Sequence, residues 1–305
     1  MQYVPGGIAA LALVILVILV AIALRRPRAG GCRGSAGAAG INIILLLREA
    51  VEPDIAGLTA ALATQWEPTL RCEEDPSLAD PAHHARCLRI SGDAGSLLLT
   101  LSATPLPAPV IELFAGSASL DAEQEAGLRA HRGTAVIHLV QSAGGAVARA
   151  RLAAQVLLTL MKWDSALGYA IVAAQQYWPR DVVEEFAARR SRTSFELFLL
   201  LAGAHRMQLS DGRYWYHTHG MEQFGLPDIE TKYADGAQHD YYRAVGGNCA
   251  LSGIDSGIAL KRGRAAAMNI DGVAYAVAPV RKDERCHFGP FGAIELIRRE
   301  APADR

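Results

Sequence analysis

Hydrophobic positions follow three different patterns along the chain. Residues 8–24 form one unbroken apolar run, IAALALVILVILVAIAL, and residues 29–40 are mostly glycine and alanine. From Ile41 onward, short apolar runs alternate with stretches of helical periodicity, and 51% of the whole sequence is hydrophobic. The pattern indicates a membrane segment, a flexible tether at residues 29–40, and a folded part with a sizeable core.

The apolar run approaches the length that a membrane-spanning helix needs, because a hydrocarbon core of about 30 Å is crossed at about 1.5 Å per residue. No lysine or arginine precedes residues 8–24, whereas Arg25, Arg26 and Arg28 follow at once. Cytoplasmic flanks of membrane helices are rich in such residues. Residues 1–28 are therefore predicted to be a single-pass anchor in a bacterial inner membrane, with the remaining chain in the cytoplasm. The alternative is a lipoprotein signal ending at Cys32, although three arginines and a proline separate this cysteine from the apolar run.

Residues 41–120 are predicted to form a first unit of one strand, one helix and one hairpin. The short apolar run from Ile41 to Glu49 predicts the strand. Helical spacing of apolar residues behind Asp54, a suitable N-cap, predicts the helix. Alternation on both sides of SGDAG, from Ser91 to Gly95, predicts the hairpin.

Residues 121–305 are predicted to form a second unit that mixes strands and helices. Strands are expected at residues 134–141, at 166–174 and at the carboxyl end, and one pair around a turn at Asp271 and Gly272. Helices are expected at residues 146–163, after Pro179 and from Asp240 onward. Residues 194–221 are expected to be two strands around the turn Ser210–Gly212. Hairpins interspersed with helices predict an α+β fold with largely antiparallel sheets and packed helices, preceded by one transmembrane helix.

The charge balance and the cysteines of the chain bear on its class of partner and on the redox state of its compartment. The chain has 30 Lys and Arg against 31 Asp and Glu, so it lacks the positive charge of a nucleic-acid-binding protein. Its five cysteines are widely spaced and contain no CxxC pair, so they predict reduced thiols rather than a disulfide framework or a cysteine-based zinc site.

One run near the middle of the second unit, HTHGMEQFGLPDIE, combines histidines, glycines and acidic residues. Together with GTAVIHLVQ, RARLAAQVLLTLM and ALGYAIVAAQQYWP before it, this run resembles an uncharacterised bacterial family, domain of unknown function 4261. The most specific part of the resemblance has the form T-x-G-M-x-x-F-G-x-P-D/E-x-E. It is matched by Thr218, Gly220, Met221, Phe224, Gly225, Pro227, Asp228 and Glu230. The resemblance brings no activity, substrate or cofactor, and the membrane segment departs from the usual soluble form of the family.

The same run allows a metal-site interpretation. On a strand, His217 and His219 would point to the same face and could offer two imidazoles to one divalent ion such as zinc. Glu222, Asp228 or Glu230 could complete the ligand set. The corresponding activity would be metal-assisted hydrolysis.

A structural interpretation accounts for more residues of the run. Gly220 and Gly225 permit backbone conformations that other residues avoid, and Pro227 fixes φ. Apolar side chains would pack such a bend, while the acidic side chains would accept hydrogen bonds from its backbone amides. The side chains expected to pack are Met221, Phe224 and Leu226.

Three further features are weaker candidates for chemistry. Cys249 could act as a nucleophile if His239 approached it, but a buried inert thiol is the simpler interpretation. His138 lies inside an apolar strand and is interpreted as a core residue. The segment QSAGGAVARAR places glycines between a strand and a helix, yet it lacks both GK[ST] and GxGxxG, so no cofactor is expected there.

These observations favour a membrane-tethered cytoplasmic domain that binds another protein, with immunity to a secreted toxin as one special case. The anchor and tether localise a domain, and no complete catalytic set of residues is visible in the sequence. The alternative is a metal-assisted hydrolase that uses His217 and His219. No nucleic acid is expected among the partners.

Overall fold

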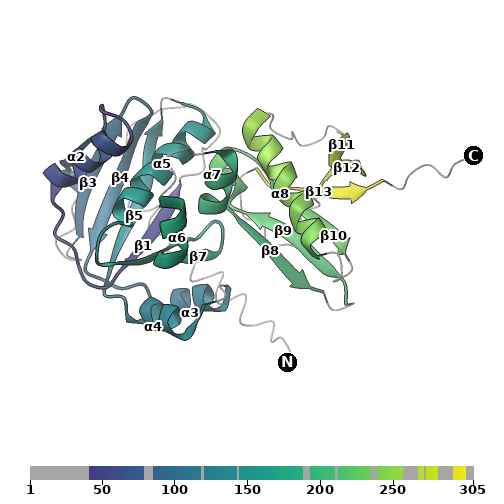
Figure 1. Cartoon of the computed structure of the whole chain (residues 1–305), viewed down its shortest axis with the longest axis horizontal. Coiled ribbons are helices and arrows are strands. Elements are labelled where there is room, and N and C mark those ends of the chain that lie inside the picture. Colours follow the sequence, from purple (N-terminus) through teal and green to yellow (C-terminus); the bar gives the residue numbers. More distant parts are fainter. Residues whose placement is uncertain are drawn as a thin grey trace, which may run out of the picture. The chain divides into compact units, whose positions relative to one another are not determined.

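The structure is a computed structural model, and residues Ala39–Arg305 group into one compact unit in it. The residues described are 41–78, 85–117, 120–142, 144–187, 193–209, 212–234, 239–256, 267–270, 273–280 and 291–299. Among them are two mostly antiparallel sheets and seven α-helices, which confirms the predicted α+β class (Figure 1).

The first sheet has seven strands in the order β2-β3-β4-β5-β1-β6-β7, and every neighbouring pair is antiparallel. It combines strands from both predicted units, 41–120 and 121–305. The hairpin of β3 and β4 turns between Gly92 and Gly95, as its sequence predicted. The strands are β1 Asn42–Leu47, β2 Arg71–Glu74, β3 Ala85–Gly92, β4 Gly95–Ser102, β5 Gly133–Ser142, β6 Ala166–Ile171 and β7 Gln176–Pro179.

The second sheet has six strands in the order β11-β12-β13-β10-β9-β8. Its pairs are antiparallel except β10 and β13, which run parallel. The strands are β8 Gly203–Gln208, β9 Tyr214–His219, β10 Asp228–Ala234, β11 Ala267–Ile270, β12 Val273–Pro279 and β13 Ala293–Arg298. The two hairpins predicted in this region, β8 with β9 and β11 with β12, are therefore present.

Helices pack on these sheets and join them through a shared apolar core. The α-helices are α2 Ile55–Gln65, α3 Ala108–Ser117, α4 Ala122–Ala130, α5 Ala146–Leu160, α6 Arg180–Ala187, α7 Ser194–Leu201 and α8 His239–Ser256. Helix α5 is buried without interruption from Leu152 to Leu160 and contacts β4, β5, α2 and α7. Asp54 caps α2 as predicted, because its carboxylate accepts a hydrogen bond from Gly57 N at 2.9 Å.

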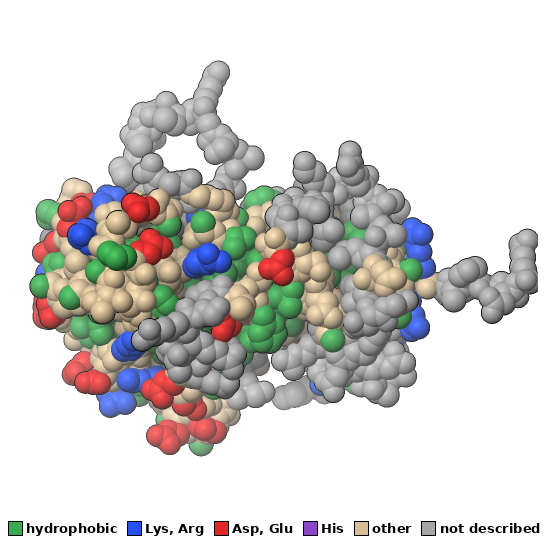
Figure 2. Space-filling model, turned by 45° about the horizontal axis from the view of Figure 1, so that its top comes forward, with side chains coloured by type: hydrophobic (Ala, Val, Ile, Leu, Met, Phe, Trp, Pro, Cys, Tyr) green, Lys and Arg blue, Asp and Glu red, His purple; other side chains and the backbone are tan. Residues whose placement is uncertain are grey.

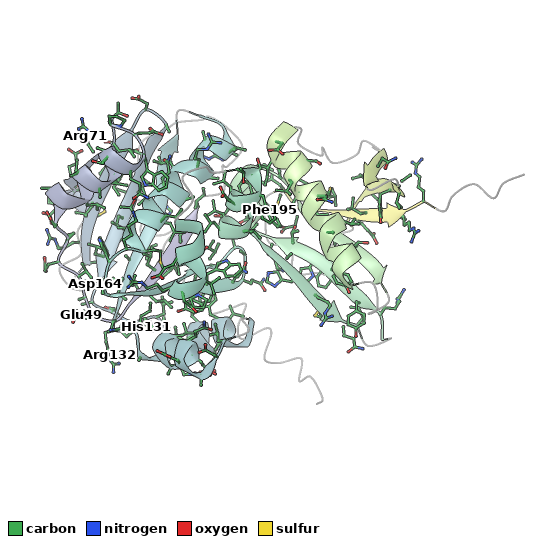
Figure 3. All side chains as sticks on the ribbon, viewed as in Figure 1. Glu49, Arg71, His131, Arg132, Asp164 and Phe195 are labelled. Carbon is green, nitrogen blue, oxygen red and sulfur yellow. The ribbon has the colours of Figure 1, made fainter. Side chains whose placement is uncertain are left out.

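The prediction of a strand at residues 194–202 is wrong, because Ser194–Leu201 forms α7. Thr193 and Glu196 make a capping box, in which each side chain bonds the other residue's backbone amide. Apolar residues surround this helix on most sides, so the sequence shows no amphipathic period there. Phe195, labelled in Figure 3, is the exposed exception at 50%.

Of two other predictions, one is wrong and one concerns residues outside the described ranges. Pro179 was expected in the first turn of a helix, but it is the last residue of β7 and α6 begins at Arg180. The predicted membrane span, residues 8–24, lies outside the described residues, and so do the predicted tether and Cys32. Within the described ranges, no helix is both long and apolar enough to cross a membrane.

Candidate site at the histidine-containing bend

Three histidines gather on adjacent strands of the second sheet. His205 on β8 is paired in register with His217 on β9, and His219 lies two residues further along the same strand. The ring centroids are 5.6 Å apart for His205 and His217, 5.1 Å for His205 and His219, and 4.7 Å for His217 and His219. His217 and His219 are predicted metal ligands from the sequence, whereas His205 is not among the predicted residues.

The sequence contains information that places His205 opposite His217. The hairpin turn was predicted at Ser210–Gly212, and counting outward by equal steps on both strands pairs residue 205 with residue 217. In the structure Leu209 N donates to Arg213 O at 2.7 Å, which fixes this register. The third histidine could therefore have been found from the turn alone.

A tryptophan and a buried glutamate border the histidines. The Trp215 ring stacks on that of His217 with a centroid distance of 3.7 Å and an interplanar angle of 20°. Its Nε1 donates to Glu230 Oε2 at 3.0 Å, and Glu230 is fully buried on β10 opposite His217. The hydrogen bond supplies the buried carboxylate with a donor, which such a group requires.

Beyond His219 the chain turns through a short 3-10 helix, η3, from Met221 to Phe224. Glycines with positive φ stand at both of its ends, 91° at Gly220 and 73° at Gly225. A residue with a Cβ atom rarely adopts this conformation. The two glycines therefore allow the chain to turn sharply after β9 and to enter β10.

Asp228 holds the bend together from the start of β10. Its Oδ1 accepts from Met221 N at 3.2 Å and from Thr218 Oγ1 at 3.4 Å. Thr218 Oγ1 in turn accepts from Ile229 N at 2.9 Å, and Asp228 Oδ2 lies 3.8 Å from His219 Nδ1. The three polar side chains, those of Asp228, Thr218 and His219, are almost entirely inaccessible to solvent.

The apolar residues of the bend belong to the main core. Met221, Phe224 and Leu226 are buried and lie in the same apolar cluster as α5, with which η3 is in contact. Pro227 is buried as well. The bend is therefore a packed corner in which Asp228 caps the amide of Met221 and Thr218 caps that of Ile229.

Burial sets the charge state of two groups here. Burial lowers the pKa of His205, and the neighbouring His219 lowers it further, whereas a hydrogen bond to Ala174 O and the charge of Asp228 act in the opposite direction. Because that carbonyl oxygen can only accept, the proton of neutral His205 resides on Nε2, 2.8 Å from it. Burial, with a smaller contribution from Asp228, raises the pKa of Glu222 to about 7.

The four predicted metal ligands, His217, His219, Glu222 and Asp228, all lie at this bend. Nevertheless, across the described ranges no group of three or more His, Cys, Asp or Glu side chains has an arrangement that could hold a metal ion. The local hydrogen bonds use Asp228 for capping instead. The hydrogen bond from Met221 N to Asp228 and the positive φ of Gly220 and Gly225 are features that the structural interpretation of the run predicts.

The remaining candidates lie elsewhere. Cys249 is fully buried in α8, where burial raises the pKa of its thiol to about 12, so the reactive thiolate is disfavoured. The side chain of His239, its suggested partner, lies outside the described residues. His138 contacts Asn42 Oδ1 through Nδ1 on the neighbouring strand β1 and is partly exposed.

Comparisons with models of protein families, with curated proteins and with solved structures give no match to this chain.

The pKa of Glu222 leads to a test of its environment. Folding keeps this carboxyl protonated up to about pH 7, whereas in the unfolded chain it ionises near its usual value of 4.5. The contribution of protonated Glu222 to the free energy of unfolding is fully present below about pH 4.5 and is lost as the pH rises toward 7. Glu222→Gln, which cannot ionise, should therefore gain about 2 kcal/mol over the wild type between pH 5 and pH 8.

Urea unfolding at a series of pH values measures this difference. Glu49→Gln is the matched control for the replacement of a glutamate by glutamine, because Glu49 is exposed just after β1 (Figure 3). Parallel stability curves for the wild type and Glu222→Gln across this range would show that Glu222 is not protonated by burial.

Proposed function

We propose that this chain is a membrane-tethered bacterial domain that binds another protein, and that strand β8 is its docking edge. The anchor at residues 8–24 and the cytoplasmic placement rest on the arginine-flanked apolar run. The docking edge rests on the position of β8 in the second sheet. The proposed partner is a protein that offers an extended strand.

The single observation that carries the proposal is the open side of β8. This strand ends the second sheet, and within the described part of the chain it pairs only with β9. Its residues Ala204, Arg206, Met207 and Gln208 are exposed, with Met207 at 46%. An unpaired edge of this kind is a template for a strand from another chain.

The other described edges are less suited to such pairing. Strands β2, β7 and β11 have four residues each. Arg71, Glu73 and Glu74 of β2 are exposed charges, and β7 ends in Pro179. Charges, proline and short length are the usual means by which proteins prevent edge pairing. By contrast, β8 has six residues, GAHRMQ, with a single formal charge at neutral pH when His205 is neutral.

The surface charge agrees with a protein partner. On the face drawn in Figure 2, acidic and basic side chains lie interspersed over the described surface, as expected from a formal net charge of −1. Nucleic-acid binding uses a coherent basic surface instead. Protein recognition through backbone hydrogen bonds of a strand does not need one.

The ladder with β9 shows which amides of β8 are available for docking. Since Leu209 N donates to Arg213 O and amide direction alternates along a strand, the amide of Met207 also points toward β9. The amide of Arg206 then points away from β9, toward the open side. Proline at position 206 would remove an edge donor without breaking the ladder, as proline is tolerated on edge strands.

A photo-crosslinking residue at position 207 of the full-length protein, expressed in the membrane of its bacterium, tests the proposal. We expect a discrete crosslinked protein product that disappears when Arg206→Pro is added and persists with Arg206→Ala, which keeps the backbone donor. The same crosslinker at Glu73 on β2 is the positional control. Identical product patterns from positions 207 and 73, or a product that survives Arg206→Pro, would rule out docking at β8.

A further inference from the structure

A cavity of about 300 Å³ lies between α8 and the second sheet, and its lining includes His205, His217, Thr218 and Glu230 of the candidate site. Helix α8 contacts β8, β9 and β10, across which it lies in Figure 1. The cavity is bordered by residues of these three strands and by Gly246 and Gly247 of the helix. We call it the α8 pocket.

Strand alternation separates the two sides of the sheet. Ala204 pairs with Thr218, and Tyr216 pairs with both Arg206 and Thr231, so these five side chains share one face. His205, His217 and Glu230 are offset by one residue and belong to the opposite face. By this alternation, Arg206 carries the only charged side chain on the pocket face among the described lining residues.

The helix side of the pocket is open because of two consecutive glycines. A Cβ atom added at Gly246 or at Gly247 would meet no atom within 4 Å, so packing against the sheet does not require glycine at either position. Glycine in a helix interior costs about 1 kcal/mol relative to alanine. Both residues therefore leave space above the strands at a cost in helix stability.

The lining defines the chemistry of a ligand that fits. Arg206 is one of the lining residues and contributes a fixed positive charge, and its guanidinium carbon lies 5.3 Å from the centroid of the Tyr214 ring. The hydroxyl of Thr231 already donates to Leu296 O at 3.2 Å. A single guanidinium matches one carboxylate, which it can bind through two parallel hydrogen bonds.

We propose that the α8 pocket binds a small organic carboxylate whose apolar or aromatic body lies between Tyr216 and the Gly246–Gly247 segment of α8. The volume is at the lower end of the range for small-molecule sites, about 300 to 1,000 Å³. Opposite the helix, Ala204 and Ile229 supply apolar surface. This inference goes beyond the proposed docking function and does not depend on it.

The probe for the test is 2-aminobenzoate, which combines a carboxylate with a fluorescent aromatic body. We expect saturable binding to the full-length protein in detergent micelles, detected as an increase in probe fluorescence. The neutral analogue 2-aminobenzamide should bind at least about tenfold more weakly, because it cannot form the charge-assisted pair with Arg206. Arg206→Ala should remove this preference for the carboxylate.

A second variant tests the location of the probe. Gly246→Leu places a side chain in the pocket from the helix, should not lower the melting temperature, and should abolish binding. Asn248→Leu introduces the same side chain at an exposed position of α8 and should bind as the wild type does. Equal binding by the wild type and folded Gly246→Leu, or no saturable binding by the wild type, would overturn the proposal.

Failure of the pocket proposal can be distinguished from failure of the docking proposal. Gly246→Leu leaves the edge amides of β8 in place, so it should lose the probe and keep the crosslinked product of position 207. Arg206→Pro acts on the edge amide as well as on the charge, and it is therefore not used to judge the pocket.

Discussion

Replacing Asp228 with alanine should lower the free energy of unfolding by about 3 kcal/mol. The carboxylate is buried, and it accepts hydrogen bonds from Met221 N and Thr218 Oγ1 while it lies beside His219. Removing it leaves a buried amide without its acceptor and takes away the negative charge next to an imidazole. An unsatisfied buried group costs about 1–3 kcal/mol, and here more than one group is affected.

Urea unfolding followed by far-ultraviolet circular dichroism gives the size of the loss. Asp228→Asn is the matched variant, because it keeps an oxygen in the same place but removes the charge, and it should lose about half as much. Glu112→Ala, at an exposed site of α3, controls for the loss of any carboxylate. If Asp228→Ala were as stable as Glu112→Ala, Asp228 would not hold the bend together.

Local sequence signals predicted the hairpins and most of the helices. The pairing of β3 with β4 and that of β11 with β12 follow from alternation on both sides of a glycine-containing segment. The cap of α2 followed from Asp54. Each of these signals lies within a few residues of the structure that it specifies.

Helix α7 shows where local signals fail. Its sequence SFELFLLL is apolar without a period, because the helix is buried on most sides, and such a run fits a buried strand equally well. The information that decides between them is the capping box of Thr193 and Glu196, three residues apart at the start of the run. That signal is present in the sequence, and it favours a helix over a strand.

Strand order and pockets require contacts between distant segments. Strand β5 lies between β4 and β1, and β10 pairs in parallel with β13 more than sixty residues later, as Ile229 faces Ile294. No turn or alternation specifies these pairings, since they depend on which apolar faces are buried together. For the same reason, the sequence around Gly246 and Gly247 does not predict that these glycines line a pocket together with Tyr216.

Replacing Gly220 with alanine should cost about 3 kcal/mol, and the cause differs from that for Asp228. The backbone at Gly220 has φ of 91°, which strains any residue with a Cβ atom. In addition, the new Cβ would lie 3.0 Å from Leu201 O and 3.2 Å from the Cβ of Ala174. Because the first of these is a backbone atom at the end of α7, relief of the contact requires movement of the helix end or of the bend.

Gly212→Ala separates the two contributions, because Gly212 has a similar φ of 82° but no atom within 4 Å of an added Cβ. It should lose only the conformational part, about 1 kcal/mol. The difference between the two variants in urea unfolding then measures the steric contact between the bend and α7. Equal losses would mean that φ alone requires Gly220, whereas the larger loss expected at Gly220 would show that this glycine also lets the polar bend and the apolar core approach each other.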